Sequence, residues 1–443
     1  MSLKSGGRRV FTTIALLLAL VMVMALAVGC GGEKEENGDS KADNGKTEST
    51  VALTWPMGYQ NNNRNGRSAV SGPGTADVLW TLEAGAQTRS WAVIGKDGNV
   101  IAGFEGKVVA VNPADGTAAW EFPTGASAST CVVGEDGSIY ASAGNSVYAL
   151  SSKGEEKWSY DMGVEADEPA IGPDGTVYVG SVGGKLVALS GDGELKWEAS
   201  VPGDIRSPAV DKSGNLYCSA APLVMYAFDK SGEQKWAFKP AGDLPLYEGM
   251  FTWANTLDVP SIGDDGTIYA GTFVTPGIKQ GGEQIPDYAI PLEGKIYAIT
   301  ADGQLKWEYV PPYERSWTIH TPSIGSDGTL YAGTSCWRVL AISTEGTLIW
   351  EFSTGEGETV CPSIYSPSIG KDGLLYAATT SAKVFCITPE GTEKWRFAAE
   401  EPWLPNYGGS NNFTPPPIAE DGTLFSVLAQ GRIYAFGTAA APQ

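Results

Sequence analysis

Short apolar runs separated by turn residues follow one another through most of the chain. In the stretch from Glu168 to Glu198, for example, three apolar runs and a tryptophan-containing run are joined by glycine-bearing turns. Apolar and polar residues that alternate between such turns predict short β-strands. Long stretches with helical spacing are missing from the sequence. The pattern therefore predicts an all-β protein.

These runs recur as a regular unit of four. A glycine closes the turn after the first run of each unit, at Gly98, Gly137, Gly175, Gly214, Gly266, Gly328, Gly373 and Gly422. The fourth run carries a tryptophan, at Trp80, Trp120, Trp158, Trp197, Trp236, Trp307, Trp350 and Trp395. A period of about 40 residues with four strands per unit is typical of a β-propeller blade, whose apolar face only its neighbours can cover. The sequence predicts an eight-bladed β-propeller of four-stranded antiparallel blades.

The order of the repeated residues predicts how the ring closes. The series begins with a tryptophan run at Trp80 and ends with a unit, from Gly422 to Phe436, that has no tryptophan run of its own. A blade that lacks its fourth strand would expose a strand edge and an apolar face. We therefore expect the N-terminal tryptophan strand to pair into the last blade.

The beginning of the chain differs from the repeats. Three basic residues precede an apolar run from Val10 to Val28, which ends at Gly29-Cys30, and these are the parts of a bacterial secretion signal. The segment resembles a lipoprotein signal, in which the cysteine becomes the lipidated mature N-terminus, although the usual leucine is displaced to Leu26. The alternative is an uncleaved membrane helix, since the run is barely long enough to span a bilayer.

These features predict the organisation of the chain. We expect residues 1–29 to be a lipoprotein signal peptide and residues 30–54 to be the lipidated cysteine with a polar, solvated tether. Residues 55–437 are expected to form the propeller, and residues 438–443 a C-terminal tail. A propeller is one closed domain, so the length of 443 residues does not call for a second.

Two features resemble the quinoprotein-type (PQQ-like repeat) propeller family. One is the segment from Trp55 to Ser68, and the other is the repeated pattern Ala-x-x-x-x-Gly-x-x-x-Trp, as in Ala188, Gly193 and Trp197. The family includes quinone-dependent alcohol dehydrogenases and the propeller lipoprotein of the outer-membrane β-barrel assembly machinery. The resemblance implies that the eight repeated tryptophans dock between adjacent blades and that the alanine and glycine of the pattern leave room for them.

Insertions interrupt the repeat only in its second half, at residues 241–257, 275–293, 311–320 and 398–416. They lengthen links between strands that propeller topology places on one rim. Their aromatic and amide side chains predict a binding surface for a protein segment or a glycan. The alternative is that these loops pack their own aromatics into small satellite cores. The candidate rim residues are Tyr247, Trp253, Asn255, Tyr313, Arg315, Trp317, His320, Trp403, Tyr407 and Asn411.

Signals for catalysis and metal binding are weak, and we assign no catalytic residue and no metal ligand. The single histidine, His320, is expected to be a hydrogen-bonded rim residue rather than a base. The quinone enzymes of the resembled family use adjacent cysteines, a calcium ion and a catalytic aspartate. No two cysteines here are adjacent, and no position carries the calcium or base roles. The quinone PQQ and calcium are therefore implied by the resemblance alone.

The remaining cysteines divide into two groups. Three fall in strand-like runs and are expected to be buried apolar residues: Cys131, Cys218 and Cys386. The other two, Cys336 and Cys361, lie on or near consecutive loops, where a disulfide could form in an exported protein.

The net charge of −21 disfavours nucleic acid as a partner, because phosphates would be repelled. We expect an exported, monomeric propeller, lipid-anchored to the cell membrane or outer membrane of a bacterium, that binds an envelope protein or glycan through its rim. The alternatives are a PQQ-dependent dehydrogenase and a purely architectural envelope protein.

Overall fold

The computed structural model describes residues 55–58, 61–88, 90–240, 255–274, 294–312, 318–335, 337–355, 363–400 and 414–438. The chain divides into two units, residues 1–50 and residues 51–443. The predictions for the signal peptide, Cys30 and the tether lie outside the described residues. Within the described part of the chain, no helix has the length and apolar character needed to cross a membrane.

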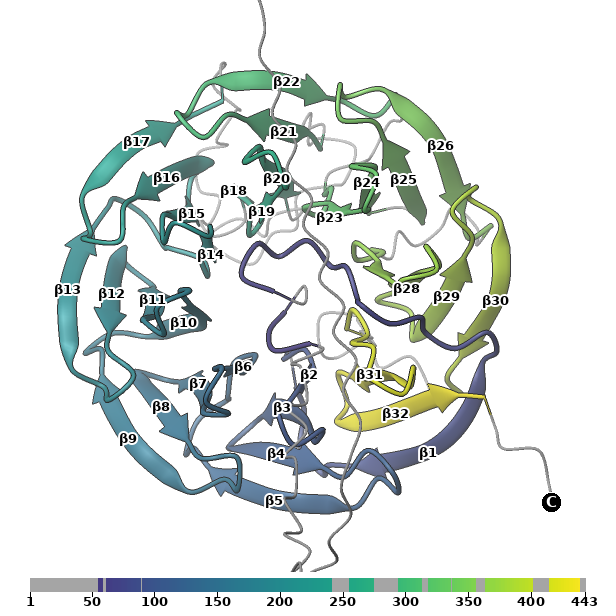
Figure 1. Cartoon of the computed structure of the whole chain (residues 1–443), viewed down its shortest axis with the longest axis horizontal. Helices are drawn as coiled ribbons and strands as arrows, with labels where there is room; N and C mark the ends of the chain where they lie inside the picture. The colour runs from purple at the N-terminus through teal and green to yellow at the C-terminus, as the bar shows by residue number, and fades with distance from the viewer. Residues whose placement is uncertain are drawn as a thin grey trace, which may run out of the picture. The chain divides into compact units, whose positions relative to one another are not determined.

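The described strands of the second unit form eight antiparallel sheets, which follow one another around a ring (Figure 1). In six of these sheets, four strands pair in chain order, and the first strand is innermost. The first three are blade 1, β2 (Val93–Ile94), β3 (Val100–Phe104), β4 (Lys107–Val111) and β5 (Ala118–Pro123); blade 2, β6 (Val132–Val133), β7 (Ile139–Ala143), β8 (Ser146–Leu150) and β9 (Glu156–Asp161); and blade 3, β10 (Ala166–Ile171), β11 (Val177–Ser181), β12 (Lys185–Leu189) and β13 (Leu195–Ser200). The others are blade 4, β14 (Ala209–Val210), β15 (Leu216–Ala220), β16 (Val224–Phe228) and β17 (Gln234–Phe238); blade 6, β23 (Ser323–Ile324), β24 (Leu330–Gly333), β25 (Arg338–Ile342) and β26 (Leu348–Ser353); and blade 7, β27 (Ser368–Ile369), β28 (Leu375–Ala378), β29 (Lys383–Ile387) and β30 (Glu393–Ala398).

Blades 5 and 8 depart from this pattern. In blade 5 the inner strand is divided into β18 (Asn255–Leu257) and β19 (Ser261–Ile262), which both pair with β20 (Ile268–Val274), and β21 (Ile296–Ile299) and β22 (Leu305–Tyr309) complete the sheet. Pro260 lies at the division, where it has no backbone N–H to donate to a ladder. Blade 8 contains β31 (Leu424–Leu428), β32 (Arg432–Gly437) and β1 (Asp77–Glu83).

Strand β1 pairs antiparallel with β32, from Asp77 opposite Gly437 to Glu83 opposite Arg432. Blade 8 thus combines strands from opposite ends of the propeller sequence, and an isolated bridge between Ile418 and Leu424 extends it inward. The prediction of an all-β, eight-bladed propeller with antiparallel blades is confirmed.

The Asp-Gly turn, which follows the inner strand in every blade except blade 4, where Ser213 precedes Gly214, results from local chemistry. In blade 3, the Asp174 carboxylate accepts the Thr176 backbone N–H at 3.1 Å, and the Gly175 N–H donates to the Gly172 carbonyl at 3.0 Å. Gly175 has a φ of 78°, a conformation that is cheap for glycine alone. The turn residues therefore determine where the chain reverses between the first and second strands.

The core lies between blades. Val93 and Ile101 of blade 1, for example, belong to one buried cluster with Ile139 and Leu150 of blade 2. Each tryptophan strengthens such a junction: the Trp158 indole N–H of blade 2 donates to the Gly191 carbonyl of blade 3 at 2.8 Å. The same type of bond, at 2.8–3.3 Å, joins Trp80 to Pro113, Trp120 to Ser152, Trp197 to Lys230, Trp236 to Ala301, Trp307 to Thr344, Trp350 to Pro389 and Trp395 to Pro73.

A glycine leaves room for the indole ring at seven of these eight turns, and the exception is the segment around Pro73 that receives Trp395. A Cβ atom added at Gly193 would come within 2.6 Å of the Trp158 ring, and Gly193 has a φ of 85°. On its other side the Trp158 ring lies against Tyr140 of its own blade, with 5.8 Å between the ring centroids. The indole is therefore held between two blades by shape as well as by its hydrogen bond.

This geometry predicts that Gly193→Ala lowers the free energy of unfolding by about 1–3 kcal/mol, the usual cost of overpacking a filled site. Gly175→Ala is the matched control, because Gly175 also has a positive φ, of 78°, while a Cβ atom there meets nothing within 4 Å. Chemical denaturation of both variants beside the parent measures the difference. Equal stability of the two variants would contradict the docking geometry.

Candidate functional site

Polar and aromatic side chains gather where the inner strands of several blades begin. We call Trp91, Arg206, Asp258, His320 and Tyr365 the axial cluster. They come from blades 1, 4, 5, 6 and 7, and short contacts join residues that are far apart in the sequence. The cluster therefore exists only when the ring is assembled.

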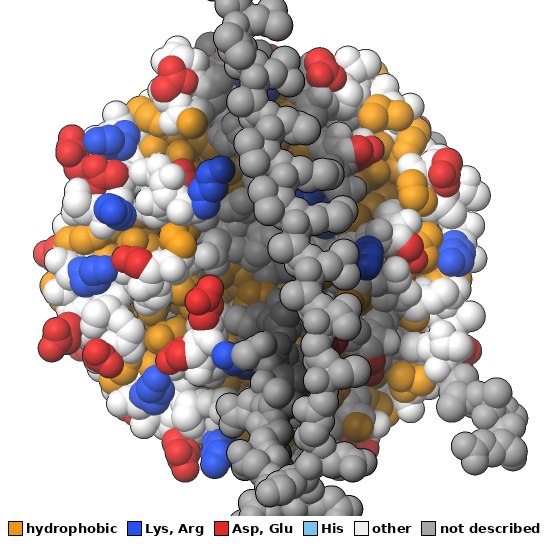
Figure 2. Space-filling model, viewed as in Figure 1, with side chains coloured by type: hydrophobic (Ala, Val, Ile, Leu, Met, Phe, Trp, Pro, Cys, Tyr) orange, Lys and Arg blue, Asp and Glu red, His pale blue; other side chains and the backbone are white. Residues whose placement is uncertain are grey.

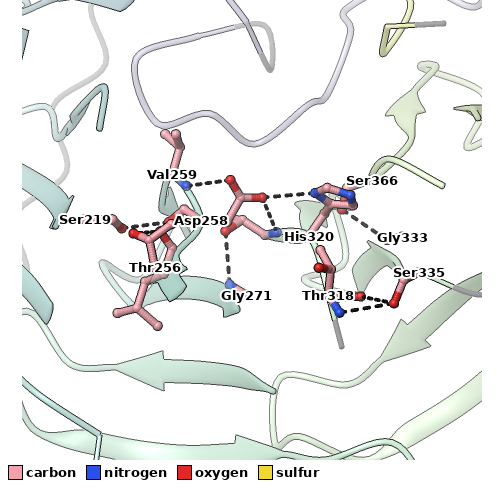
Figure 3. A network of polar contacts seen from close by, with 12 residues as sticks. Ser219, Thr256, Asp258, Val259, Gly271, Thr318, His320, Gly333, Ser335 and Ser366 are labelled. Atoms are coloured by element: carbon pink, nitrogen blue, oxygen red, sulfur yellow. Dashed lines mark hydrogen bonds and ion pairs between the residues drawn. The ribbon is translucent and has the colours of Figure 1, made fainter. Parts of the chain in front are cut away.

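Asp258 is the centre of the polar contacts (Figure 3). Its Oδ2 atom lies 3.2 Å from His320 Nδ1 and accepts the Thr321 backbone N–H at 3.2 Å, while Oδ1 accepts the Val259 N–H at 2.9 Å. The backbone of Asp258 is also fixed, since its carbonyl accepts the Ser219 hydroxyl of blade 4 at 2.7 Å. Asp258 thus links blade 5 to blade 6 through its carboxylate and to blade 4 through its backbone carbonyl.

Burial raises the pKa of Asp258, but the hydrogen bond with His320 and the nearby charges of His320 and Arg206 outweigh this effect and lower the pKa below its usual value. The carboxyl group is therefore ionised at neutral pH. Asp258 and His320 have exposed fractions of 8% and 3%, so their interaction is shielded from water. An ionised carboxylate beside His320 orients the imidazole ring.

Aromatic rings extend the cluster across the ring of blades. The rings of His320 and Tyr365 lie 4.9 Å apart between centroids, and Tyr365 contacts Trp91 of blade 1 edge-on at 6.4 Å. Burial, with a smaller contribution from the charge of Asp258, raises the pKa of Tyr365 to about 12. The Tyr365 hydroxyl thus remains protonated at neutral pH and can donate a hydrogen bond.

A second buried ion pair lies next to the axial cluster. Arg64 Nη2 lies 3.2 Å from Glu168 Oε1 and also donates to the Ser207 hydroxyl, and Arg64 Nε donates to the Pro208 carbonyl at 3.3 Å. Burial raises the pKa of Glu168, and the charge of Arg64 offsets only part of that increase. The pair joins blades 3 and 4 to the segment that precedes β1.

Most of the predicted rim residues lie outside the described residues: Tyr247, Trp253, Tyr313, Arg315, Trp317, Trp403, Tyr407 and Asn411. Asn255 is described by its backbone alone, at the start of β18. His320 is the one whose side chain is described; it is hydrogen-bonded, and it is buried at the inner start of blade 6.

The cysteines in strand-like runs, Cys131, Cys218 and Cys386, are free and fully buried, as predicted. Burial raises the pKa of Cys131 to about 12, so its thiol stays neutral. Cys336 and Cys361 lie outside the described residues, so a disulfide between them stays a prediction. No group of three or more His, Cys, Asp and Glu among the described residues could hold a metal ion.

The described residues do not provide the features that the resemblance requires for PQQ and calcium. The three described cysteines belong to blades 2, 4 and 7, so none could supply the adjacent pair. The carboxylate at the centre of the axial cluster, Asp258, is already bonded to His320 and to two backbone N–H groups. We therefore derive no reaction step through either group.

Sequence reasoning missed most of the axial cluster. Arg206, Asp258, His320 and Tyr365 each stand two residues before the proline at the inner start of a blade, before Pro208, Pro260, Pro322 and Pro367. An alignment of the repeats on these prolines would have brought the four side chains to one position. Trp91 has no such proline, because Val93 follows Ala92 there.

The visible face of the propeller carries charged side chains of both signs (Figure 2). On the face in Figure 2, acidic and basic side chains are interspersed around the outer part of the ring. Many form pairs across neighbouring strands, such as Lys107 with Glu121 at 3.0 Å and Lys295 with Glu308 at 3.1 Å. This distribution agrees with the inference that nucleic acid is a poor partner.

Comparisons with known proteins support the family resemblance. The family model described as "Outer membrane protein assembly factor BamB" matches residues 65–151 and 143–315, more than half of the chain. A search of curated proteins found no match.

Two solved structures are similar in fold. BamB from Moraxella catarrhalis has 13% identity and a TM-score of 0.57, with 83% of this chain and 99% of that chain covered. Quinohemoprotein alcohol dehydrogenase from Comamonas testosteroni has 12% identity and a TM-score of 0.62, with 89% and 82% covered. At these identities the likeness extends to the fold alone. The family match is what decides: this chain belongs to the PQQ-like propeller family of outer membrane protein assembly factor BamB.

Proposed function

We propose that the protein is a non-catalytic, exported lipoprotein that binds a protein partner, or a glycan, of the bacterial envelope through the rim that carries the insertions. Membership in the BamB family is the observation that carries this proposal, since it supports an envelope location and an assembly role. Fold alone would not be enough, because propellers serve many unrelated functions.

The arrangement of strand ends supports the choice of rim. The insertions follow β17, β20, β22 and β30, and they lead into an inner strand or into the third strand of a blade. In antiparallel four-stranded blades these two kinds of link emerge on the same side of the ring. The Asp-Gly turns and the glycine turns that receive the tryptophans emerge on the opposite side. The insertions can therefore form one continuous surface.

The proposal predicts that Trp253→Ala, Trp317→Ala and Trp403→Ala weaken partner capture without lowering the melting temperature. An aromatic anchor at the centre of an interface commonly contributes about 2 kcal/mol or more to binding, whereas one in a satellite core contributes to stability. We expect Trp317 to be the most sensitive, because it lies on the shortest of these insertions and has less entropy to lose.

Pull-down from solubilised envelope, beside the melting temperature of each variant, measures both effects. Trp197→Ala is a control, since this tryptophan docks between blades and its loss should lower stability. A lower melting temperature in all three rim variants, or unchanged partner capture in all three, would contradict the proposal.

Lipid anchoring makes a separate prediction. Cys30→Ser should block lipid attachment and leave the protein as a precursor or in a released form, because two acyl chains on one residue are what hold such a protein durably at a bilayer. Fractionation with a carbonate wash distinguishes the outcomes. A variant that stays with membranes as firmly as the parent would favour an uncleaved helix from Val10 to Val28.

The alternative function is a PQQ-dependent dehydrogenase. The likeness to a quinohemoprotein alcohol dehydrogenase is a likeness of fold and does not favour this activity. Reconstitution with PQQ and calcium, followed by a dye-linked assay with alcohols, tests the alternative independently of partner capture.

A further inference from the structure

The segment that precedes β1 makes the same type of hydrogen bond with one blade after another. We call residues 55–58 and 61–74 the N-terminal arm. In Figure 1 the arm is the purple segment that crosses the centre of the ring before it joins β1. Its carbonyl groups accept backbone N–H groups from inner strands at 2.7–3.1 Å, pairing Trp55 with Ile94, Pro56 with Val133, Asn62 with Val210, Asn63 with Ile262, Asn65 with Ile324 and Gly66 with Ile369.

The donors occupy one equivalent position in blades 1, 2, 4, 5, 6 and 7, the last residue of the short inner strand. The inner strand is an edge strand, so this N–H has no partner within its own sheet, and a buried N–H without a partner is costly. The arm satisfies these groups through its backbone.

The arm also contacts the two remaining blades, 3 and 8, but through interactions other than these backbone hydrogen bonds. Arg64 reaches Glu168 of blade 3, and the carbonyl of Ser71 lies so close to Gly422 of blade 8 that an added Cβ would come within 2.8 Å. Residues of increasing number along the arm thus meet the blades largely in their order around the ring. The arm then continues as β1 in blade 8.

Arg64 is the most deeply buried charge of the arm. Its side chain is 1% exposed, it has a φ of 53°, and it is bonded to Glu168, Ser207 and Pro208. A buried arginine is tolerated only with its partners in place. Arg67 offers a contrast on the same arm, since its pair with Asp264, at 3.1 Å, has side chains that are 25% and 73% exposed.

We propose that the arm is an axial clasp that holds the inner strands of the blades in register, and that Arg64 is the residue that anchors it. The clasp closes the side of the ring from which the Asp-Gly turns emerge, since Arg67 bonds the carbonyl of Gly325 and the carboxylate of Asp264 in two of these turns. It also supports the axial cluster, because a Cβ atom at Gly58 would meet the Trp91 ring at 2.7 Å.

Hydrogen exchange of the full mature chain tests the clasp. Arg64→Ala should speed exchange by about tenfold or more at the inner-strand amides of all six bonded blades together, because release of the arm removes a partner from each. Amides of the outer strands should keep their protection. The matched control Arg67→Ala removes the same charge from the arm and should affect only amides near Asp264 and Gly325.

The distribution of the change decides the outcome. Faster exchange confined to Val210 and the surroundings of Glu168 would reduce Arg64 to a local ion pair and overturn the proposal. The double variant Arg64→Ala/Glu168→Gln removes the unpaired carboxylate: exchange that stays fast in six blades supports the clasp, and protection restored everywhere overturns it. If Arg64→Ala does not fold, Arg64→Lys is measured by the same criterion, since it keeps the charge and loses the fork that bonds Glu168, Ser207 and Pro208.

Discussion

A blade of this propeller cannot bury its own apolar face, and every other feature of the structure depends on that constraint. The apolar clusters are shared between neighbouring blades, and each repeated tryptophan is inserted at a junction, with its ring against its own blade and its N–H on a carbonyl beyond it. The energy of such contacts is available only when the neighbour is present. Stability and the positions of the inner strand ends are therefore properties of the complete ring.

The fold could be predicted because its determinants are local and repeated. Asp174-Gly175 specifies a turn through a side-chain acceptor and a positive φ, and Gly193 provides a gap for one indole ring. The residues that determine the strands and turns of a blade therefore lie close together in its own repeat. The axial cluster could not be predicted in the same way. Asp258, His320 and Tyr365 lie in three different repeats, and nothing in one repeat indicates that it will meet the others.

The N-terminal arm was harder still to interpret from sequence. Its bonds to the blades use backbone carbonyl groups, which leave no signature in residue type. Arg64 stands in an asparagine-rich stretch that has the composition of a loop, and its partner Glu168 is 104 positions away. Backbone recognition and long-range ion pairs become visible only in the assembled ring.

The acceptor of the Trp395 indole N–H has a consequence for how such a ring can change in evolution. In the other blades the indole bonds a residue in the turn before the next blade's fourth strand, but blade 8 takes that strand from the beginning of the propeller, and Pro73 supplies the carbonyl instead. The junction between blades 7 and 8 is thus a seam unlike the other seven. Elsewhere in the ring, a blade could be gained by duplication of a repeat or lost by its deletion. A circular permutation that moved the chain ends to another turn would have to join β32 to β1 by a continuous hairpin, as in the other blades.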